Sequence, residues 1–229
     1  MTTLLKPALA AGLAIAAIAT APAVQAQVSG PIATVNAPEV VIKSAAFRNA
    51  YQQIDATYAA QRTTIQERSQ QRQALLTQLD TNGDGRLDEA EQQAAQTAPQ
   101  RTQIEQLEQE IQQISGEIDL VRVFAVEQIL RQYVTALQQV VQSNNIQMVL
   151  ANDSIVFAQP AANISDKIVA DLNTRLPTVQ TTPPANYQPA RQSVAIFQEV
   201  SQLLLAAQAQ AQAQRAQPAA PAAQQPTGR

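Results

Sequence analysis

The chain has 229 residues and a formal net charge of −3, and it contains neither cysteine nor histidine. The lack of both residue types excludes disulfides, thiolate metal sites, thiol catalysis and the usual general base. The acidic balance gives no electrostatic footprint for nucleic acid. Aromatic residues make up only 3% of the chain, so we expect long solvated helices rather than a large compact core.

The first 26 residues have the pattern of a cleavable signal peptide. Lys6 precedes an apolar, alanine-rich stretch over residues 8–19, and the small-residue pattern at 24–26 predicts cleavage before Gln27. A membrane anchor is the alternative, but the apolar stretch is short for a membrane span. We therefore predict an exported protein whose mature chain begins at residue 27.

Two long helices are predicted from apolar residues that recur at alternating steps of four and three, as in a coiled coil. The first covers Glu39–Leu79 and begins after Asn36, which with Glu39 resembles a capping box. The second covers Gln100–Ser143, and a short helix over Asp88–Gln96 precedes it. Because the long helices are nearly equal and joined at one tip, we expect an antiparallel hairpin.

Short β-strands flank this hairpin. The predicted strands are Pro31–Asn36, Ile146–Ala151 and Ser154–Ala158, the last two separated by a turn at Asn152-Asp153. A final short helix over Asp166–Leu176 is expected to be capped by Ser165. The predicted fold class is therefore α+β, with a long helical hairpin on a small β-sheet body.

The composition changes after Pro177, since seven of the 13 prolines lie at or beyond this position. We predict a linker over residues 178–190 and a disordered tail over 216–229. Between them, residues 193–215 could form an amphipathic helix with Val194, Phe197, Val200 and Leu204 on one face. Two interpretations stay open: a helix that forms only transiently, or a segment that docks on the body or on a partner.

The segment Asp80–Glu91, DTNGDGRLDEAE, fills each position of an EF-hand calcium loop. The expected oxygen ligands are the side chains of Asp80, Asn82, Asp84, Asp88 and Glu91 and the backbone carbonyl of Arg86. Glu91 would supply both carboxylate oxygens, Asp88 would act directly or through water, and Gly85 would allow the sharp turn. An ordinary acidic turn is the alternative, and the number of matching positions disfavours it.

The loop is single, whereas EF-hands usually work in pairs, so we expect weak binding of calcium, at ~10⁻⁴–10⁻³ M. Without calcium the carboxylates repel one another and the tip is expected to be loose. With calcium the tip is expected to stiffen and to set the angle between the helices. Calcium would then be a modulator of the hairpin rather than the purpose of the protein.

Three segments resemble the Skp/OmpH family of periplasmic chaperones: residues 32–36 (IATVN), 146–158 (IQMVLANDSIVFA) and 163–176 (NISDKIVADLNTRL). The resemblance covers about residues 31–176. It implies a periplasmic homotrimer with a β-rich body, whose helical tentacles enclose unfolded outer-membrane proteins, with no enzymatic activity. It allows a peripheral contact with the membrane or the assembly machinery. The acidic charge, the loop 80–91 at the tentacle tip and the extension after residue 177 depart from the family pattern.

We therefore predict a holdase chaperone with a calcium-binding tip. A calcium-binding structural or adaptor protein of the cell envelope, without chaperone activity, is the alternative. A secreted enzyme is the weakest hypothesis, because the chain offers no nucleophile constellation.

Overall fold

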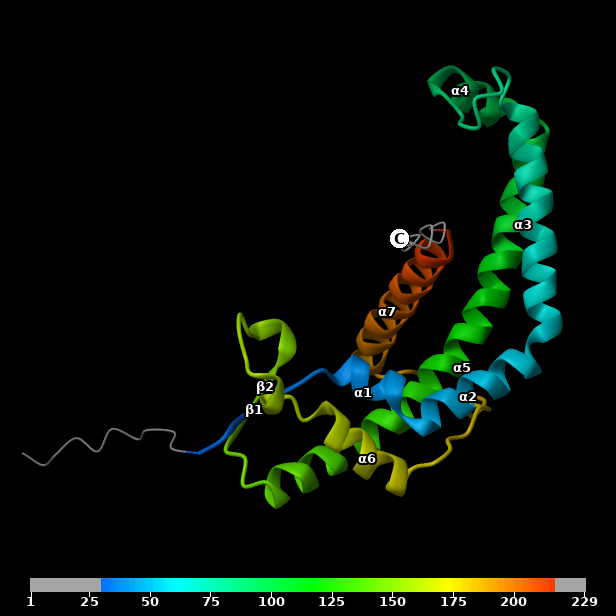
Figure 1. The fold of residues 1–229 in the computed structure, drawn as a ribbon. Helices are drawn as coiled ribbons and strands as arrows, with labels where there is room; N and C mark the ends of the chain where they lie inside the picture. The colour runs from blue at the N-terminus through cyan, green and yellow to red at the C-terminus, as the bar shows by residue number, and fades with distance from the viewer. Residues whose placement is uncertain (1–29, 217–229) are drawn as a thin grey trace, which may run out of the picture.

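The computed structural model describes residues 30–216, which form a small body and a long helical arm (Figure 1). It is mostly helical, with one two-stranded sheet. The predicted signal peptide (residues 1–26) and residues 217–229 of the predicted tail lie outside this part of the chain. Between residues 30 and 216, no helix combines the length and the apolar character that a membrane crossing requires.

The sheet pairs two strands that are far apart in the sequence. Strand β1 (Ile32–Val35) lies parallel to β2 (Met148–Ala151), with Ile32 opposite Met148 and Val35 opposite Ala151. Parallel pairing requires a long crossover, and here the whole arm serves as that connection. Both strands agree with the prediction, and they bring the two ends of the hairpin together at its base.

The third predicted strand, Ser154–Ala158, is wrong. Ser154 is the last residue of a 3-10 turn, η1 (Asn152–Ser154), residues 155–158 are irregular, and a second 3-10 turn, η2 (Pro160–Ala162), follows them. Val156 and Phe157 are 106% and 78% exposed, so this segment neither joins the sheet nor covers the core. Besides β2, strand β1 pairs only with Asn163 among the described residues, through an isolated parallel bridge at Thr34.

The predicted single helix Glu39–Leu79 is also wrong in one respect, because it is divided into α1 (Ala37–Lys43), α2 (Ala45–Thr57) and α3 (Ala59–Leu79). At the first break Ser44 is extended; its hydroxyl donates to the Val41 carbonyl and accepts from the Phe47 N–H. Such local bonds compete with the helix ladder. The Ala45 N–H is taken by Asn173, 128 residues away, so tertiary contacts fix this break.

The remaining arm helices follow the prediction closely. Helix α4 (Glu89–Thr97) begins after Asp88, and α5 (Gln100–Ser143) begins after Pro99. Helix α5 ends at the two asparagines: Asn144 is its C-cap, and Asn145 has a φ of 52°. Helices α3 and α5 lie side by side along the arm (Figure 1), as the antiparallel hairpin required.

The core lies in the body and at the base of the arm. Buried side chains from β1, α1, α2, α5 and α6 (Ser165–Arg175) form one cluster, which includes Val40, Phe47, Ile129, Ile168 and Leu172. A second cluster between α2 and α5 contains Ala50, Ile54, Ile118, Val121 and Ala125. Burial therefore stops part-way along the arm, and α3 has no buried side chain.

Ser165 does not cap α6 as predicted, because it is the first residue of the helix. Its hydroxyl accepts a hydrogen bond from the Asn36 N–H at 3.1 Å, and its own N–H is taken by Asn163. The side chain thus joins α6 to the end of β1. The extension continues into α7 (Arg191–Ala216), which packs on α1 and α5.

Candidate functional site

The predicted calcium loop lies at the far tip of the arm, between the end of α3 and the start of α4 (Figure 1). It is held by side chains that bond to its own backbone. Asp80 accepts from the N–H groups of Gly83 and Gly85, at 2.7 and 2.8 Å. Both glycines have positive φ, 75° and 81°, which a residue with a Cβ rarely adopts.

Two further predicted ligands make the same kind of contact. The side chain of Asn82 accepts from the Asp84 N–H, and that of Asp84 accepts from the Arg86 N–H, both at 2.8 Å. These short-range bonds are Asx turns, which asparagine and aspartate favour. Asp80, Asn82 and Asp84 are thus used to shape the loop that was predicted to bind the ion.

Glu91 occupies a different environment from the other predicted ligands. This residue is only 6% exposed. One carboxylate oxygen accepts from the hydroxyl and N–H of Thr81 and from the Asn82 N–H, at 2.7–3.1 Å. The other accepts from the Asp88 N–H, while Asp88 accepts from the Glu91 N–H, which completes a capping box for α4.

These bonds stabilise the charged form of Glu91. The Thr81 hydroxyl has the largest effect, and the backbone N–H groups of Asp88, Asn82 and Thr81 add to it against the opposing effect of burial; together they lower the pKa of Glu91 to about 2. The carboxylate therefore already has several donors without an ion.

The loop supplies donors of the right kind for calcium, since carboxylate and carbonyl oxygens are the ligands it prefers. Within residues 30–216, however, no three Asp or Glu side chains converge closely enough to hold a metal ion. The Glu91 carboxylate is directed to the N–H groups of Thr81, Asn82 and Asp88 rather than to the other acids. Calcium binding at Asp80, Asn82, Asp84, Arg86, Asp88 and Glu91 therefore stays a prediction.

The arm behind the tip carries polar pairs across its seam. Arg68 and Arg72 on α3 form salt bridges with Glu110 and Glu108 on α5, at 2.7 and 3.6 Å. These arginines interrupt the apolar repeat in the sequence, and the salt bridges show what they contact. Exposed pairs of this kind contribute little stability, so the outer arm is held together weakly.

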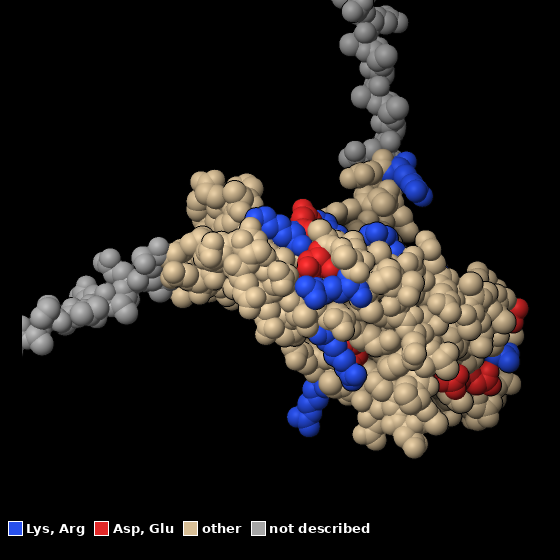
Figure 2. All heavy atoms as spheres, turned by 90° about the horizontal axis from the view of Figure 1, so that it is seen from below, with Lys and Arg blue, Asp and Glu red and all other residues tan. Residues whose placement is uncertain are grey.

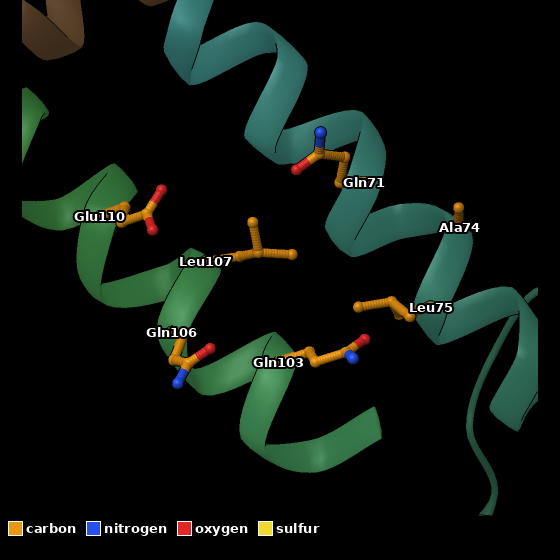
Figure 3. Close-up of a pocket in the computed structure, with 7 residues that line it drawn as sticks. All are labelled: Gln71, Ala74, Leu75, Gln103, Gln106, Leu107 and Glu110. Carbon is orange, nitrogen blue, oxygen red and sulfur yellow. The ribbon is translucent and has the colours of Figure 1, made fainter. Parts of the chain in front are cut away.

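A groove of about 410 Å³ opens between α3 and α5 in the outer arm (Figure 3). Leu75 and Leu107 extend into it from opposite helices (Figure 3). Glutamine side chains and one glutamate surround these leucines: Gln71, Gln103, Gln106 and Glu110. A second hollow of about 230 Å³ lies beside α4 and includes Leu76, Leu79, Leu87 and Ile104. The outer arm thus offers apolar surface surrounded by polar groups, most of which are glutamines.

The body also exposes large apolar side chains. Besides Val156 and Phe157, the strands expose Ile32, Met148 and Leu150 by 47%, 39% and 37%. Seen from below the body, charged side chains are few and of both signs, and most of the face is uncharged (Figure 2). Ile32 and Met148 lie opposite one another in the sheet, and exposed apolar residues that lie together commonly mark an interaction surface. The sequence did not reveal it, because the segment 154–158 has the composition of a buried strand.

A buried carboxylate at the base of the arm was also missed from the sequence. Glu127 on α5 is 7% exposed and accepts hydrogen bonds from the extension that leads to α7. A signal was present: Glu127 is the one charged residue in the otherwise apolar run Val123–Val126, Ile129–Leu130. A single charged residue in an apolar run predicts that its charge is paired or that this side of the helix is exposed.

Comparison with known proteins gives one family match. The model of the family described as "Outer membrane protein (OmpH-like)" matches residues 31–172. A solved OmpH-like protein from Caulobacter crescentus CB15 is similar over 71% of this chain and 93% of its own, at 20% identity and a TM-score of 0.40. The search of curated proteins found no match. The family match extends from β1 into α6, so it leaves out α7.

Proposed function

This chain belongs to the OmpH-like family of outer membrane proteins, and we propose that it is a holdase that shelters unfolded outer-membrane proteins in the periplasm. The family consists of periplasmic chaperones and is not enzymatic. Holding a client requires many weak contacts rather than a catalytic site, because unfolded chains share no single sequence and aggregate through exposed apolar segments.

The groove between α3 and α5 is the observation that carries this proposal. Leu75 and Leu107 are only half-buried, so each can contact an apolar client segment. The surrounding glutamines can bond to an unfolded backbone without demanding a particular side chain. The weak packing of the outer arm would let the groove adapt to different clients.

Assembly into a homotrimer is part of the proposal. The exposed apolar residues of the body, Ile32, Met148, Leu150, Val156 and Phe157, supply a surface that self-association would bury. Sedimentation of the mature chain tests this directly. A concentration-independent monomer would contradict the trimer, and Phe157→Ser should weaken a genuine one.

The holdase activity is tested by suppression of aggregation of a urea-unfolded outer-membrane β-barrel diluted into buffer. We expect wild type to suppress aggregation and the double variant Leu75→Gln, Leu107→Gln to do so poorly. The matched control is Gln70→Ala, Gln112→Ala, which changes exposed glutamines of the same two helices that do not line the groove. Failure of wild type itself would overturn the proposal.

We further propose that calcium binds the tip loop and modulates the arm. The motif and the ordered turns of the loop support this, and Glu91 would have to exchange some of its N–H donors for the ion. Calorimetry should detect calcium binding by wild type that is weakened in Glu91→Gln. Because Glu91 also caps α4, Asp84→Asn is the better variant: it keeps an acceptor for the Arg86 N–H and removes only charge.

Equal calcium binding by wild type and Asp84→Asn would exclude the loop as the site. A regulatory effect is tested separately, by hydrogen exchange over residues 72–100. Calcium at millimolar concentration should slow exchange there if it orders the tip, and unchanged exchange would contradict modulation.

An adaptor protein of the cell envelope is the second candidate function. The observation that favours it is the separate hollow beside α4, where Leu76, Leu79 and Leu87 lie next to the calcium motif. Failure to hold any unfolded β-barrel, with or without calcium, would favour this function over the holdase.

A further inference from the structure

The segment between α6 and α7 is hydrogen-bonded to α2 and α5, the two helices at the base of the arm. We call residues 177–190 the strap. Its backbone at Gln180 forms a reciprocal pair with the Gln128 side chain, which donates at 2.9 Å and accepts at 3.0 Å. Asn49 on α2 donates to the Pro177 carbonyl at 3.0 Å. The predicted linker is therefore laid against α2 and α5.

Glu127 fastens the end of the strap where α7 begins. One of its carboxylate oxygens accepts from the Tyr187 hydroxyl at 2.8 Å and from the Ala190 N–H at 3.1 Å. The other accepts from Arg131, at 2.6 Å. The Tyr187 ring also makes an edge contact with Phe124, with centroids 4.9 Å apart. A buried carboxylate that loses such donors is costly, so these contacts favour the closed strap.

Helix α7 itself is held by little apolar burial. Of the side chains described in this 26-residue helix, only Val200 and Ser193 are buried. Ile196, Phe197 and Leu204 are partly buried against the core. Elements with few buried contacts open at the lowest free energy, so the strap contacts must contribute substantially to keeping α7 in place.

The surface beneath α7 belongs to the main core. Helix α7 packs on α1 and α5. These two helices contribute Val40, Val41, Val126 and Ile129 to the buried cluster of the main core. The occupant is nearly uncharged, since Arg191, Glu199 and Arg215 are its only ionic residues. The surface therefore accepts a helical, apolar and weakly charged segment.

We propose that α7 is an intrachain occupant of an apolar docking surface between α1 and α5, and that the Glu127 contacts set how often this surface is open. An apolar segment of an unfolded polypeptide has the chemistry that α7 shows there and would compete with it. The identity of that competitor rests on the proposed holdase function, whereas the opening of α7 does not.

The opening is tested by hydrogen exchange in the full chain. Glu127→Gln removes the charge, and Tyr187→Phe removes one donor while keeping the ring against Phe124. We expect amide exchange over residues 191–204 to rise about 10- to 100-fold in Glu127→Gln and about tenfold in Tyr187→Phe. Exchange over 100–115 should not change, and Glu117→Gln, an exposed acid on the same helix, should match wild type.

Availability of the surface is tested with a fluorescent peptide of residues 191–216 as the probe. Its apparent affinity should rise by the same factor as the exchange, because binding requires the open state. Exchange equal to wild type in both variants would overturn the proposal. Faster exchange without tighter peptide binding would overturn it as well, since α7 would then fray without uncovering a binding surface.

The competitor is tested by adding a urea-unfolded outer-membrane β-barrel to the peptide complex of Tyr187→Phe. Displacement of the peptide supports competition by client. No displacement, in a protein that still suppresses aggregation of that barrel, would overturn the client assignment. If the protein fails to suppress aggregation of the barrel, the proposed holdase function is contradicted. The conclusion that α7 opens, drawn from the peptide binding, is not affected by that outcome.

Discussion

The base and the outer part of the arm belong to one hairpin but are stabilised by different interactions. At the base, α2 and α5 enclose Ile54, Ile118 and Val121, all at most 3% exposed. In the outer part, α3 buries no side chain and is joined to α5 by exposed salt bridges such as Arg68–Glu110. The hairpin is therefore anchored by a buried core at one end and by exposed polar pairs at the other, a difference that the proposed holdase function would use.

The largest loss of stability is expected from a change in the core at the base of the arm. Ile54→Ala removes a fully buried side chain, so we expect it to lower the free energy of unfolding by about 3 kcal/mol. Leu75→Ala, at a half-buried position of α3 in the outer arm, should cost less than about 1 kcal/mol. Urea denaturation measures both, and equal losses would contradict the distinction between base and outer arm.

The strap contacts at Glu127 should depend on pH. Burial alone would raise the pKa of this carboxyl, but the donors Ala190, Tyr187 and Arg131 outweigh it and lower the pKa below its usual 4.5. The folded state therefore gains stability above about pH 4.5 and loses it as the pH falls further. We expect about 2 kcal/mol from bonds to this charge, lost on acidification.

Hydrogen exchange of α7 between pH 6 and pH 3, corrected for intrinsic rates, measures this loss. In Glu127→Gln the protection of α7 should be low and nearly independent of pH. A pH dependence that persists in the variant would assign the effect to another carboxyl group.

A smaller effect is expected at the break between α1 and α2. Ser44→Ala removes the hydroxyl that caps α2 and bonds to Val41, so we expect a loss of about 1 kcal/mol in thermal or urea unfolding. Ser44→Thr keeps the hydroxyl and is the matched control. An increase in the free energy of unfolding of Ser44→Ala would contradict this prediction, because it would mean that the break between α1 and α2 does not stabilise the base of the arm.

The smallest effect is expected in the outer arm. Arg68→Gln removes an exposed salt bridge, so the free energy of unfolding should change by less than about 0.5 kcal/mol, and less still at high salt. A double-mutant cycle with Glu110→Gln measures the coupling. A coupling above about 2 kcal/mol would mean that the outer arm is as firmly held as the base.

Local chemistry was sufficient to predict the positions of many elements. Asn36 begins the first helix, Pro99 precedes the long one and the pair at 144–145 ends it. Each signal acts over a few residues, because capping and proline restriction are local effects. The loop Asp80–Glu91 was also recognisable from its own sequence, and its turns are formed by bonds between neighbouring residues.

Other features needed partners far along the chain. Ser44 interrupts the helix where Asn173 takes the Ala45 N–H, and the segment 154–158 leaves Val156 and Phe157 exposed rather than paired. Neither outcome is visible in a short window, since apolar composition says nothing about whether a strand edge is available.

The sequence by itself determined a helical hairpin flanked by short strands, although it predicted one strand too many, and it determined a recognisable family and an acidic tip, because each is encoded by spacing or by adjacent residues. Only the tertiary structure decided that burial ends part-way along the arm and that Glu91 bonds to backbone N–H groups. It also decided that Glu127 holds the strap and α7 against the body. The Glu127 contacts join groups that are 60 and 63 residues apart in the chain, and a buried charge shows its partner only when the chain is folded.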